Sequence, residues 1–464
     1  MSPGHRSARA LVGALLPALG LLAGCKRAPT HAVPRNLLLI SVDTLRADEL
    51  GAYGATYGIS PSIDALAESG VVFENAASVS SWTLPAFASI LTSTYPSTHQ
   101  VQAFSAALDP SFVTLGEVLS EAGFATAAVT SHAFVGPRYG MHQGIAAFDT
   151  ALITGKRQAE LKVSSPEVTA RGVRWLEGAV EEEQRWFLWL HYFDPHFPYI
   201  RHGDPEQPEG DTEEDYRGDI AFTDEWIGVL LDELERLGAA DDTLVVLLSD
   251  HGEEFRERKK LRHGFTLFRE VVHMPFIARV PGTAPRRVSE AVSGVDVLPT
   301  VLELLDLPTP AAAVGRSLVP AMLGGRLEEQ PILGELRLNS GYRADSLQLG
   351  PWKLVLDHSG RSTLGFAEYP GGPAIDDSPG PHAPSGDLAE QALLFRIDED
   401  PAELHDVADE HPDEVARMRS TLEALLERAR AVAGKAGRAV EHDADDLELL
   451  RQLGYVSDES GGGD

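Results

Sequence analysis

The sequence predicts an α/β protein built on a doubly wound, mostly parallel sheet, with a small C-terminal α+β subdomain. Short apolar runs at residues 36–43 and 243–250 each end in a carboxylate. Such runs are typical of strands that are buried on both faces of a parallel sheet. Amphipathic helical patterns lie between the runs, and this alternation indicates a sheet covered by helices on both sides.

The remaining elements of the main domain follow the same alternation. Two further apolar runs predict strands at residues 124–130 and 186–191. Helices are expected at residues 60–69, 115–122, 165–182 and 215–237. The first of these opens with Ser60-Pro61, and proline is well suited to the first position of a helix.

The chain changes character after about residue 310. Residues 347–357 and 393–397 resemble strands of a small antiparallel unit, and residues 365–386 are rich in proline and glycine, which predicts a long loop. Helices are expected at residues 413–432 and 443–453. We therefore divide the folded part into a main domain at 36–310, a C-terminal subdomain at 311–457 and a flexible tail at 458–464.

The N-terminus has an export pattern. Arg6 and Arg9 precede the apolar run 10–23, which is too short to span a membrane comfortably and resembles a secretory signal. The motif Leu22-Ala-Gly-Cys25 resembles a bacterial lipobox, whose cysteine is lipidated. Residues 1–25 are then signal and lipobox, and 26–35 a tether to a bacterial membrane, with the protein facing the periplasm or the exterior. The alternative is a plain signal peptide with an incidental cysteine.

Composition excludes several classes of protein. The chain has 464 residues, 43% of them hydrophobic, so a sizeable core can form. Its formal net charge of -31 repels nucleic-acid phosphates, and we expect no nucleic-acid partner. The single cysteine allows no intrachain disulfide and no thiolate metal site. The negative net charge also repels an anionic substrate at long range, so such a substrate must be held by local metal and cationic groups.

Polar side chains at two strand ends predict a metal site. Asp43 and Thr44 end one apolar run, and Asp250 and His251 end another. In doubly wound sheets such ends meet where ligands bind. Two carboxylates, a hydroxyl and an imidazole suit a divalent cation such as Ca²⁺, Mn²⁺ or Zn²⁺. The alternative is that the two aspartates only cap the helices that follow.

The motifs around these residues resemble the sulfatase family of the alkaline-phosphatase superfamily. The matching segments are spread over residues 36 to 456: Ile40–Asp48, Gly51–Gly54, Ser60–Ala67, Gly70–Phe73, Ser249–Glu254, Arg262–Gly264, Met274-Pro275, Trp352–Leu354, Leu394–Pro401 and Leu453–Val456. The resemblance implies an α/β catalytic domain and one divalent metal ion, Ca²⁺ in this family. It also implies a small-molecule or glycan ester as substrate.

The segment Ser81-Trp-Thr-Leu-Pro-Ala-Phe87 resembles the family's nucleophile motif but departs from it. Active sulfatases carry Cys or Ser two residues before the proline, oxidised to formylglycine, and Arg two residues after it. Here the positions hold Thr83 and Phe87, so no formylglycine is expected. A threonine hydroxyl beside a metal can still act as nucleophile and ligand, as in phosphodiesterases and phosphotransferases of the superfamily. Thr83 as a helix cap is the alternative, and Ser80 and Ser81 are candidate substitutes.

Several histidines lie in motif context. His196 and His263 are expected to stabilise charge or to protonate the leaving oxygen, whereas His191 is expected to be a buried, hydrogen-bonded residue. Asp194 with His196 and His263 is an alternative second metal site. Packing histidines are the other alternative. Weaker candidates are Arg46, which is expected to pair with Asp48 or to brace the Asp43 loop, and Ser131-His132, of which His132 lies at the end of a predicted strand.

The sequence thus predicts a metal-dependent hydrolase of sulfate or phosphate esters with a hydroxyl nucleophile at Thr83. A phosphodiesterase, phosphatase or phosphotransferase on the same scaffold is the first alternative. A catalytically inactive metal-binding protein is the second, supported by the loss of the motif arginine at Phe87. The sequence leaves the oligomeric state and the identity of the substrate open.

Overall fold

The structure is a computed structural model that describes residues 1, 32–153, 163–202, 209–258, 261–337, 343–358, 390–433 and 438–442. Residues Met1–Thr30 form a unit separate from His31–Asp464, and every element below lies in the second unit. The lipobox at Cys25, the segment 365–386 and the helix predicted at 443–453 lie outside the described residues. None of the described helices is both long and apolar enough to span a bilayer.

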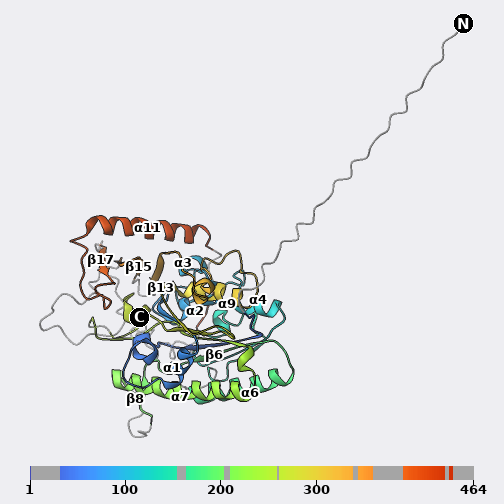
Figure 1. Cartoon of the computed structure of the whole chain (residues 1–464). Coiled ribbons are helices and arrows are strands. Elements are labelled where there is room, and N and C mark those ends of the chain that lie inside the picture. The colour runs from blue at the N-terminus through green and yellow to red at the C-terminus, as the bar shows by residue number, and fades with distance from the viewer. Residues whose placement is uncertain are drawn as a thin grey trace, which may run out of the picture. The chain divides into compact units, whose positions relative to one another are not determined.

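A mostly parallel sheet forms the centre of the main domain (Figure 1). In spatial order its eight strands are β13 (Arg286–Ser293), β2 (Val71–Ala77), β12 (Phe276–Arg279), β9 (Thr243–Ser249), β1 (Asn36–Val42), β6 (Trp186–Tyr192), β4 (Ala125–Thr130) and β5 (Ala147–Asp149). Only β12 runs antiparallel to its neighbours β2 and β9. The predicted doubly wound sheet is therefore confirmed.

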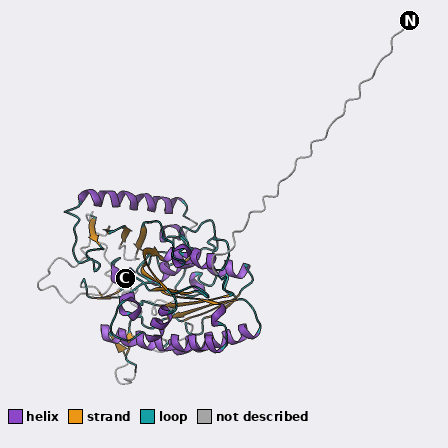
Figure 2. Cartoon of the chain, in the orientation of Figure 1, coloured by secondary structure: helices purple, strands orange, loops and turns teal. Residues whose placement is uncertain are grey.

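Helices cover both faces of this sheet (Figure 2). One layer contains α1 (Pro61–Glu68), α6 (Ser165–Glu181) and α7 (Glu213–Arg236), and the other contains α2 (Thr83–Thr92), α4 (Leu115–Glu121) and α9 (Val297–Leu304). Alternate side chains of β1 point to opposite layers: Leu37 and Leu39 pack with α2 and α4, whereas Leu38 and Ile40 pack with α1, α6 and α7. Both faces of β1 are therefore dry, as its uninterrupted apolar run predicts.

The C-terminal part forms a four-stranded antiparallel sheet with one long helix across it. Its elements are β14 (Ile332–Arg337), β15 (Arg343–Leu349), β16 (Trp352–Asp357), β17 (Gln391–Arg396) and α11 (Pro412–Ala431). The single strand predicted at 347–357 is wrong, because the chain turns back at Gly350 with φ +59°, and Leu349 pairs with Trp352. Glycine adopts this left-handed conformation without steric cost.

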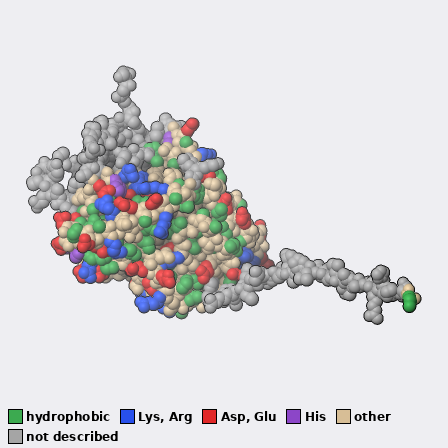
Figure 3. Space-filling view, turned by 90° about the horizontal axis from the view of Figure 1, so that it is seen from above, with side chains coloured by type: hydrophobic (Ala, Val, Ile, Leu, Met, Phe, Trp, Pro, Cys, Tyr) green, Lys and Arg blue, Asp and Glu red, His purple; other side chains and the backbone are tan. Residues whose placement is uncertain are grey.

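Short elements complete the structure. They are α3 (Pro96–His99), α8 (Arg269–Val272), α10 (Val319–Met322), β3 (Ala106–Ala107), β7 (Tyr199–Ile200), β8 (Glu209–Gly210), β10 (Glu254–Phe255), β11 (Leu261–Arg262) and β18 (Arg438–Ala439). On the face seen from above, acidic and basic side chains are interspersed (Figure 3).

A buried ion pair within the C-terminal subdomain is connected to the main domain by a backbone hydrogen bond. Lys353 Nζ, on β16, lies 2.8 Å and 3.0 Å from the two carboxylate oxygens of Glu403. The same carboxylate accepts a hydrogen bond from the backbone N–H of Arg269, which begins α8. The backbone of α8 in turn bonds the loop after β9, because Gly252 N–H donates to the Val271 carbonyl over 2.9 Å. The subdomain therefore braces the loop that follows Asp250.

Replacing Lys353 with methionine should lower the free energy of unfolding by about 3–5 kcal/mol, because the Glu403 carboxylate would stay buried without its partner. Urea unfolding followed by circular dichroism measures this change. The double variant Lys353→Met/Glu403→Gln should recover most of the loss, since it removes both charges. An unfolding midpoint for Lys353→Met equal to that of the wild type would show that the pair does not stabilise the fold.

Candidate metal centre and active site

The candidate site lies at the carboxyl ends of the central strands. β1 pairs in parallel with both β6 and β9, with Val42 opposite Tyr192 and Ser249. Asp43 follows β1 directly and Asp250 follows β9 directly, so the two carboxylates emerge at the same edge. Both side chains are fully buried. The register of the sheet thus places two acidic groups side by side in a dry environment.

Three side chains form a cluster of metal-ligating atoms. One atom each from Asp43, Asp250 and His251 lies within 4.8 Å of the others. His251 Nε2 is 3.3 Å from Asp250 Oδ2 and 3.9 Å from Asp43 Oδ1. Burial, followed by the negative charge of Asp250, raises the pKa of Asp43 well above its ordinary value. A divalent cation between the carboxylates would remove both costs.

The surroundings of His251 and Asp250 leave one atom of each side chain available to a metal ion. The Gly252 carbonyl can only accept, so at 2.9 Å His251 Nδ1 is the protonated nitrogen and Nε2 presents a lone pair to the carboxylates. Metal-binding histidines are oriented in this way by the bond of their second nitrogen. Asp250 Oδ2 is buried and makes no hydrogen bond with a described residue. These residues fit a divalent metal ion.

The backbone around the cluster is constrained. Thr44 has φ +54°, a conformation that β-branched residues rarely adopt. Its N–H donates to Asp250 Oδ1 over 3.3 Å, whereas its hydroxyl donates to the Pro195 carbonyl. A Cβ at position 252 would lie 2.1 Å from the Glu270 carbonyl oxygen, so only glycine can follow His251 here.

Thr83 lies beside the cluster at the start of α2. Its Oγ1 is 3.5 Å from Asp43 Oδ1 and 3.3 Å from His251 Nε2, and the residue is fully buried. Trp82 is the N-cap, and the Thr83 hydroxyl is in the first turn without capping the helix. The alternative of Thr83 as a helix cap is therefore wrong. A helix N-terminus presents backbone N–H groups that favour an anion.

Histidines line the other side of the cluster. The His263 ring packs at a tilt against the His251 ring, with centroids 4.5 Å apart, and His196 lies edge-on to His263 at 4.9 Å. His263 Nδ1 lies 3.0 Å from Glu253 Oε1. Burial raises the pKa of Glu253 to about 8 and lowers the pKa of His263 well below its ordinary value, so burial favours the uncharged form of each. Burial likewise lowers the pKa of His196.

Two histidines lie next to Asp43, His191 on β6 and His132 just after β4. His191 Nε2 lies 3.4 Å and His132 Nε2 4.0 Å from Asp43 Oδ2. Both rings are buried, and burial lowers the pKa of His191 to about 4. The buried, hydrogen-bonded His191 predicted from sequence is confirmed, since its Nδ1 lies 3.0 Å from the Ser41 hydroxyl. Phe87 packs edge-on against the His191 ring at 4.9 Å.

Asp194 has a different role from the one considered in the second-metal alternative. Its oxygens accept hydrogen bonds from the backbone N–H groups of Ser164 and Ser165 and from the Ser165 hydroxyl at 2.6 Å. The carboxylate oxygens of Asp194 are therefore occupied by hydrogen bonds from residues at the start of α6. The alternative that Asp194 binds a second metal ion is wrong.

The other minor candidates have structural partners. Arg46 pairs with Asp48 over 2.8 Å, as one reading of the sequence expected, and also donates to the Glu253 carbonyl. The Ser80 hydroxyl donates to the Glu335 carbonyl, and the Ser131 hydroxyl donates to the His191 carbonyl.

Sequence reasoning assigned no role to Glu253, Tyr199 or Ser41. Tyr199 donates its hydroxyl to Glu253 Oε2 over 3.1 Å and so holds the carboxylate that faces His263. Glu253 could have been found from its place in the motif after Asp250. Tyr199 and Ser41 carry no signal of this kind, because their contacts depend on the packing of distant segments.

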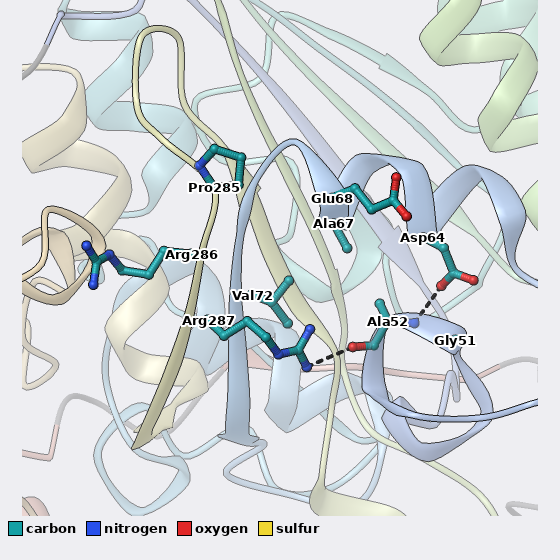
Figure 4. A pocket seen from close by; sticks show the side chains of 9 residues that line it. All are labelled: Gly51, Ala52, Asp64, Ala67, Glu68, Val72, Pro285, Arg286 and Arg287. Atoms are coloured by element: carbon teal, nitrogen blue, oxygen red, sulfur yellow. Dashed lines mark hydrogen bonds between the residues drawn. The ribbon is translucent and has the colours of Figure 1, made fainter.

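An open cleft lies away from this centre (Figure 4). Val72 is near the start of β2 and Arg286 opens β13, whereas the metal-ligating residues follow the carboxyl ends of their strands. Arg287 is already bonded to Glu74 and to the Ala52 carbonyl. The cleft is therefore not part of the candidate active site.

Comparison with known proteins agrees with this geometry. The family model described as Sulfatase matches residues 35–307. An N-acetylgalactosamine-6-O-sulfatase of Bacteroides thetaiotaomicron is 23% identical, over 89% of this chain and 98% of the relative. A choline-sulfatase of Rhizobium meliloti is 26% identical, over 69% of this chain and 78% of the relative.

Solved structures show the same fold. A phosphonate monoester hydrolase from Silicibacter pomeroyi superposes with a TM-score of 0.66 at 19% identity, covering 85% of this chain and 95% of the other. A protein in complex with D-glucosamine-2-N,6-O-disulfate gives a TM-score of 0.68 at 17% identity, covering 86% of this chain and 99% of the other.

A mostly parallel sheet with a candidate metal site at its carboxyl edge and a small antiparallel C-terminal sheet defines an alkaline-phosphatase-like hydrolase scaffold. Because its model matches more than half of the residues, the chain belongs to the sulfatase family. The curated relatives named above are sulfatases, that is, sulfuric ester hydrolases.

Asp250→Asn and His251→Ala should each lose bound metal and unfold at a lower temperature in metal-containing buffer. Bound metal stabilises only the folded state, by about 2.7 kcal/mol at 100 times the dissociation constant. Metal content by plasma mass spectrometry and melting curves with and without metal measure both effects.

The matched control is Asp224→Asn, which alters another buried carboxylate. Asp224 accepts the N–H groups of Ser62 and Ile63 at the start of α1, so this variant should keep its metal. Full metal content in both Asp250→Asn and His251→Ala would place the site elsewhere.

Proposed function

We propose that the protein is a metal-dependent hydrolase of sulfate or phosphate esters that uses Thr83 as its nucleophile. The observation that carries this proposal is the position of Thr83 Oγ1, within 3.5 Å of both Asp43 Oδ1 and His251 Nε2 at the first turn of α2. A metal ion at the neighbouring ligand atoms would activate the buried hydroxyl as a nucleophile. The N–H groups at the N-terminus of α2 would bind the transferred anion.

Asp43, Thr44, Asp250 and His251 are the proposed metal ligands, together with Thr83. The family favours Ca²⁺, and the mixed oxygen and imidazole donors also suit Mn²⁺ or Zn²⁺. The cation would lower the proton affinity of the Thr83 hydroxyl and neutralise charge on the transferred group. Thr44 is the least direct of these ligands, since its hydroxyl donates to the Pro195 carbonyl.

In the proposed reaction Thr83 Oγ forms a bond to the sulfur or phosphorus of the ester, and the bond to the alcohol oxygen breaks. The proton that the Thr83 hydroxyl loses passes to the departing alcohol oxygen by way of the uncharged rings of His263 and His196, which lie together next to His251. Water then hydrolyses the covalent Thr83 ester and returns the hydroxyl. A formylglycine at this position is not part of the proposal, because threonine carries a methyl group on its β-carbon.

Phosphate diesters and phosphonate monoesters form the second class of candidate substrates. The structural likeness to a phosphonate monoester hydrolase supports this class. Phe87, where active sulfatases carry arginine, packs on Trp189 and His191 and supplies no charge, which instead supports the alternative of an inactive metal-binding protein. Assays on aryl sulfates, phosphate monoesters, phosphodiesters and phosphonate monoesters with added metal distinguish these classes from an inactive metal-binding protein.

Export and lipid anchoring through Cys25 complete the proposal. Cys25→Ser should move the protein from the membrane fraction to the soluble exported fraction, because it removes the thiol that would carry the lipid. Fractionation and immunoblotting measure this change. Membrane association equal to that of the wild type would contradict the anchor.

Thr83→Ala should lower kcat on the best substrate by at least about 10³-fold, since the attacking atom is gone, while the melting temperature stays close to that of the wild type. Steady-state kinetics measure the loss. Thr92→Ala, at the other end of α2, is the matched control and should keep its activity, because its hydroxyl bonds the Ala88 carbonyl and the Thr94 hydroxyl and none of the candidate site residues.

Two further outcomes separate the candidate nucleophiles. Ser81 Oγ is also buried, without a hydrogen bond to a described residue, and loss of activity in Ser81→Ala but not in Thr83→Ala would move the nucleophile there. Most activity remaining in both variants would instead indicate attack by water.

A further inference from the structure

The two carboxylate oxygens of Asp43 face different groups. Oδ1 lies 3.5 Å from Thr83 Oγ1 and 3.9 Å from His251 Nε2, on the side of the metal-ligating cluster. Oδ2 lies 3.4 Å from His191 Nε2 and 4.0 Å from His132 Nε2. Oδ2 and both of these nitrogens are buried, and none of the three makes a hydrogen bond with a described residue. Two imidazoles therefore converge on the oxygen that turns away from the cluster.

The protonated nitrogen of His132 follows from its backbone partner. Its Nδ1 lies 3.0 Å from the backbone N–H of Phe134, which can only donate. Nδ1 is therefore the acceptor, and the ring carries its proton on Nε2. Because Nε2 lies 4.0 Å from Asp43 Oδ2, the partial positive charge of this N–H group is close enough to attract that oxygen electrostatically.

A chain of hydrogen bonds from the interior of the sheet gives His191 the same form. The indole N–H of Trp189 donates to Ser41 Oγ over 2.9 Å, and Ser41 Oγ lies 3.0 Å from His191 Nδ1. The other acceptor of the Ser41 hydroxyl, the Leu190 carbonyl, is more distant at 3.4 Å. Donation to Nδ1 leaves the proton on Nε2. A lone pair on Nε2 would instead face the lone pairs of Asp43 Oδ2 and repel them.

We propose that His132 and His191 are positioning residues that direct their Nε2–H groups to Asp43 Oδ2 and so turn Oδ1 toward the metal ion. This inference rests on the proposed metal centre. Partners of a metal-binding carboxylate fix its orientation, and their loss typically weakens metal binding by roughly 10- to 100-fold. Phe87 assists by packing edge-on against the His191 ring, which limits the rotation of that ring.

The protons on Nε2 of His132 and His191 also bear on how many metal ions the centre binds. An imidazole nitrogen that carries a proton cannot bind a cation. His132 and His191 are therefore not ligands of a second metal ion, although both lie next to a carboxylate. The centre then binds one cation per chain.

Calorimetric titration of the metal-free protein with Mn²⁺ tests the positioning role without using activity. His191→Leu and Ser41→Ala should raise the dissociation constant by roughly 10- to 100-fold. His191→Gln should retain more affinity, because its amide N–H can replace Nε2–H. The control is Thr130→Val, since Thr130 lies opposite His191 on β4 and its buried hydroxyl makes no hydrogen bond with a described residue. This variant should bind Mn²⁺ like the wild type.

Long-range ¹H–¹⁵N spectra report which ring nitrogen carries the proton, and signals are assigned by their loss in His191→Gln and His132→Gln. Both rings should show a protonated Nε2, and in Ser41→Ala the His191 ring should shift toward the form protonated on Nδ1. A proton on Nδ1 of His191 in the wild type would overturn the proposal.

The titration separates the two hypotheses. Unchanged affinity in Ser41→Ala and His191→Leu, with affinity lost in Asp250→Asn, would overturn the positioning role and leave the proposed function intact. Absence of Mn²⁺, Ca²⁺ and Zn²⁺ binding by the wild type would overturn the metal centre itself and the proposal with it.

Discussion

The structure depends on one electrostatic constraint, which is that two fully buried carboxylates lie together at the edge of the central sheet. Asp43 and Asp250 have no solvent contact, and their mutual repulsion adds to the cost of burial. Such a pair is stable only with a compensating cation or with protons. The lone pair of His251, the hydroxyl of Thr83 and the converging imidazoles are all arranged around this pair.

The rest of the fold holds the two strand ends in register. β1 lies between β6 and β9 with all its residues buried, so its position cannot shift without exposing a dry core on both faces. The left-handed conformation of Thr44 and the close approach of Gly252 to Glu270 direct the chain away from the sheet while leaving the side chains of Asp43 and His251 in place. The Lys353–Glu403 pair braces the loop from the far side through α8.

The sequence predicted the parts of this arrangement that depend on local pattern. Uninterrupted apolar runs located β1, β6, β9 and β4, because strands buried on both faces need no polar alternation. Their polar ends indicated Asp43, Asp250 and His251, since parallel strands share one carboxyl edge. The turn at Gly350 was missed because the flanking apolar residues read as one continuous strand.

Interactions between distant segments could not be predicted. Three such interactions depend on side-chain directions that no short motif encodes. They are the hydrogen bonds of Asp194 at the start of α6, the Tyr199–Glu253 contact and the Trp189–Ser41–His191 chain. Family resemblance located Thr83, but only the structure shows that Trp82, and not Thr83, is the N-cap of α2.

Anomalous X-ray diffraction from crystals grown with Mn²⁺ tests the central claim most directly, because it locates the metal without reference to any assay. We expect one anomalous peak per chain, from a bound Mn²⁺ ion within ligand distance of Asp43 Oδ1, Asp250 Oδ2, His251 Nε2 and Thr83 Oγ1. A chain without a peak at this position, or a peak bound by Nε2 of His132 and His191, would contradict it.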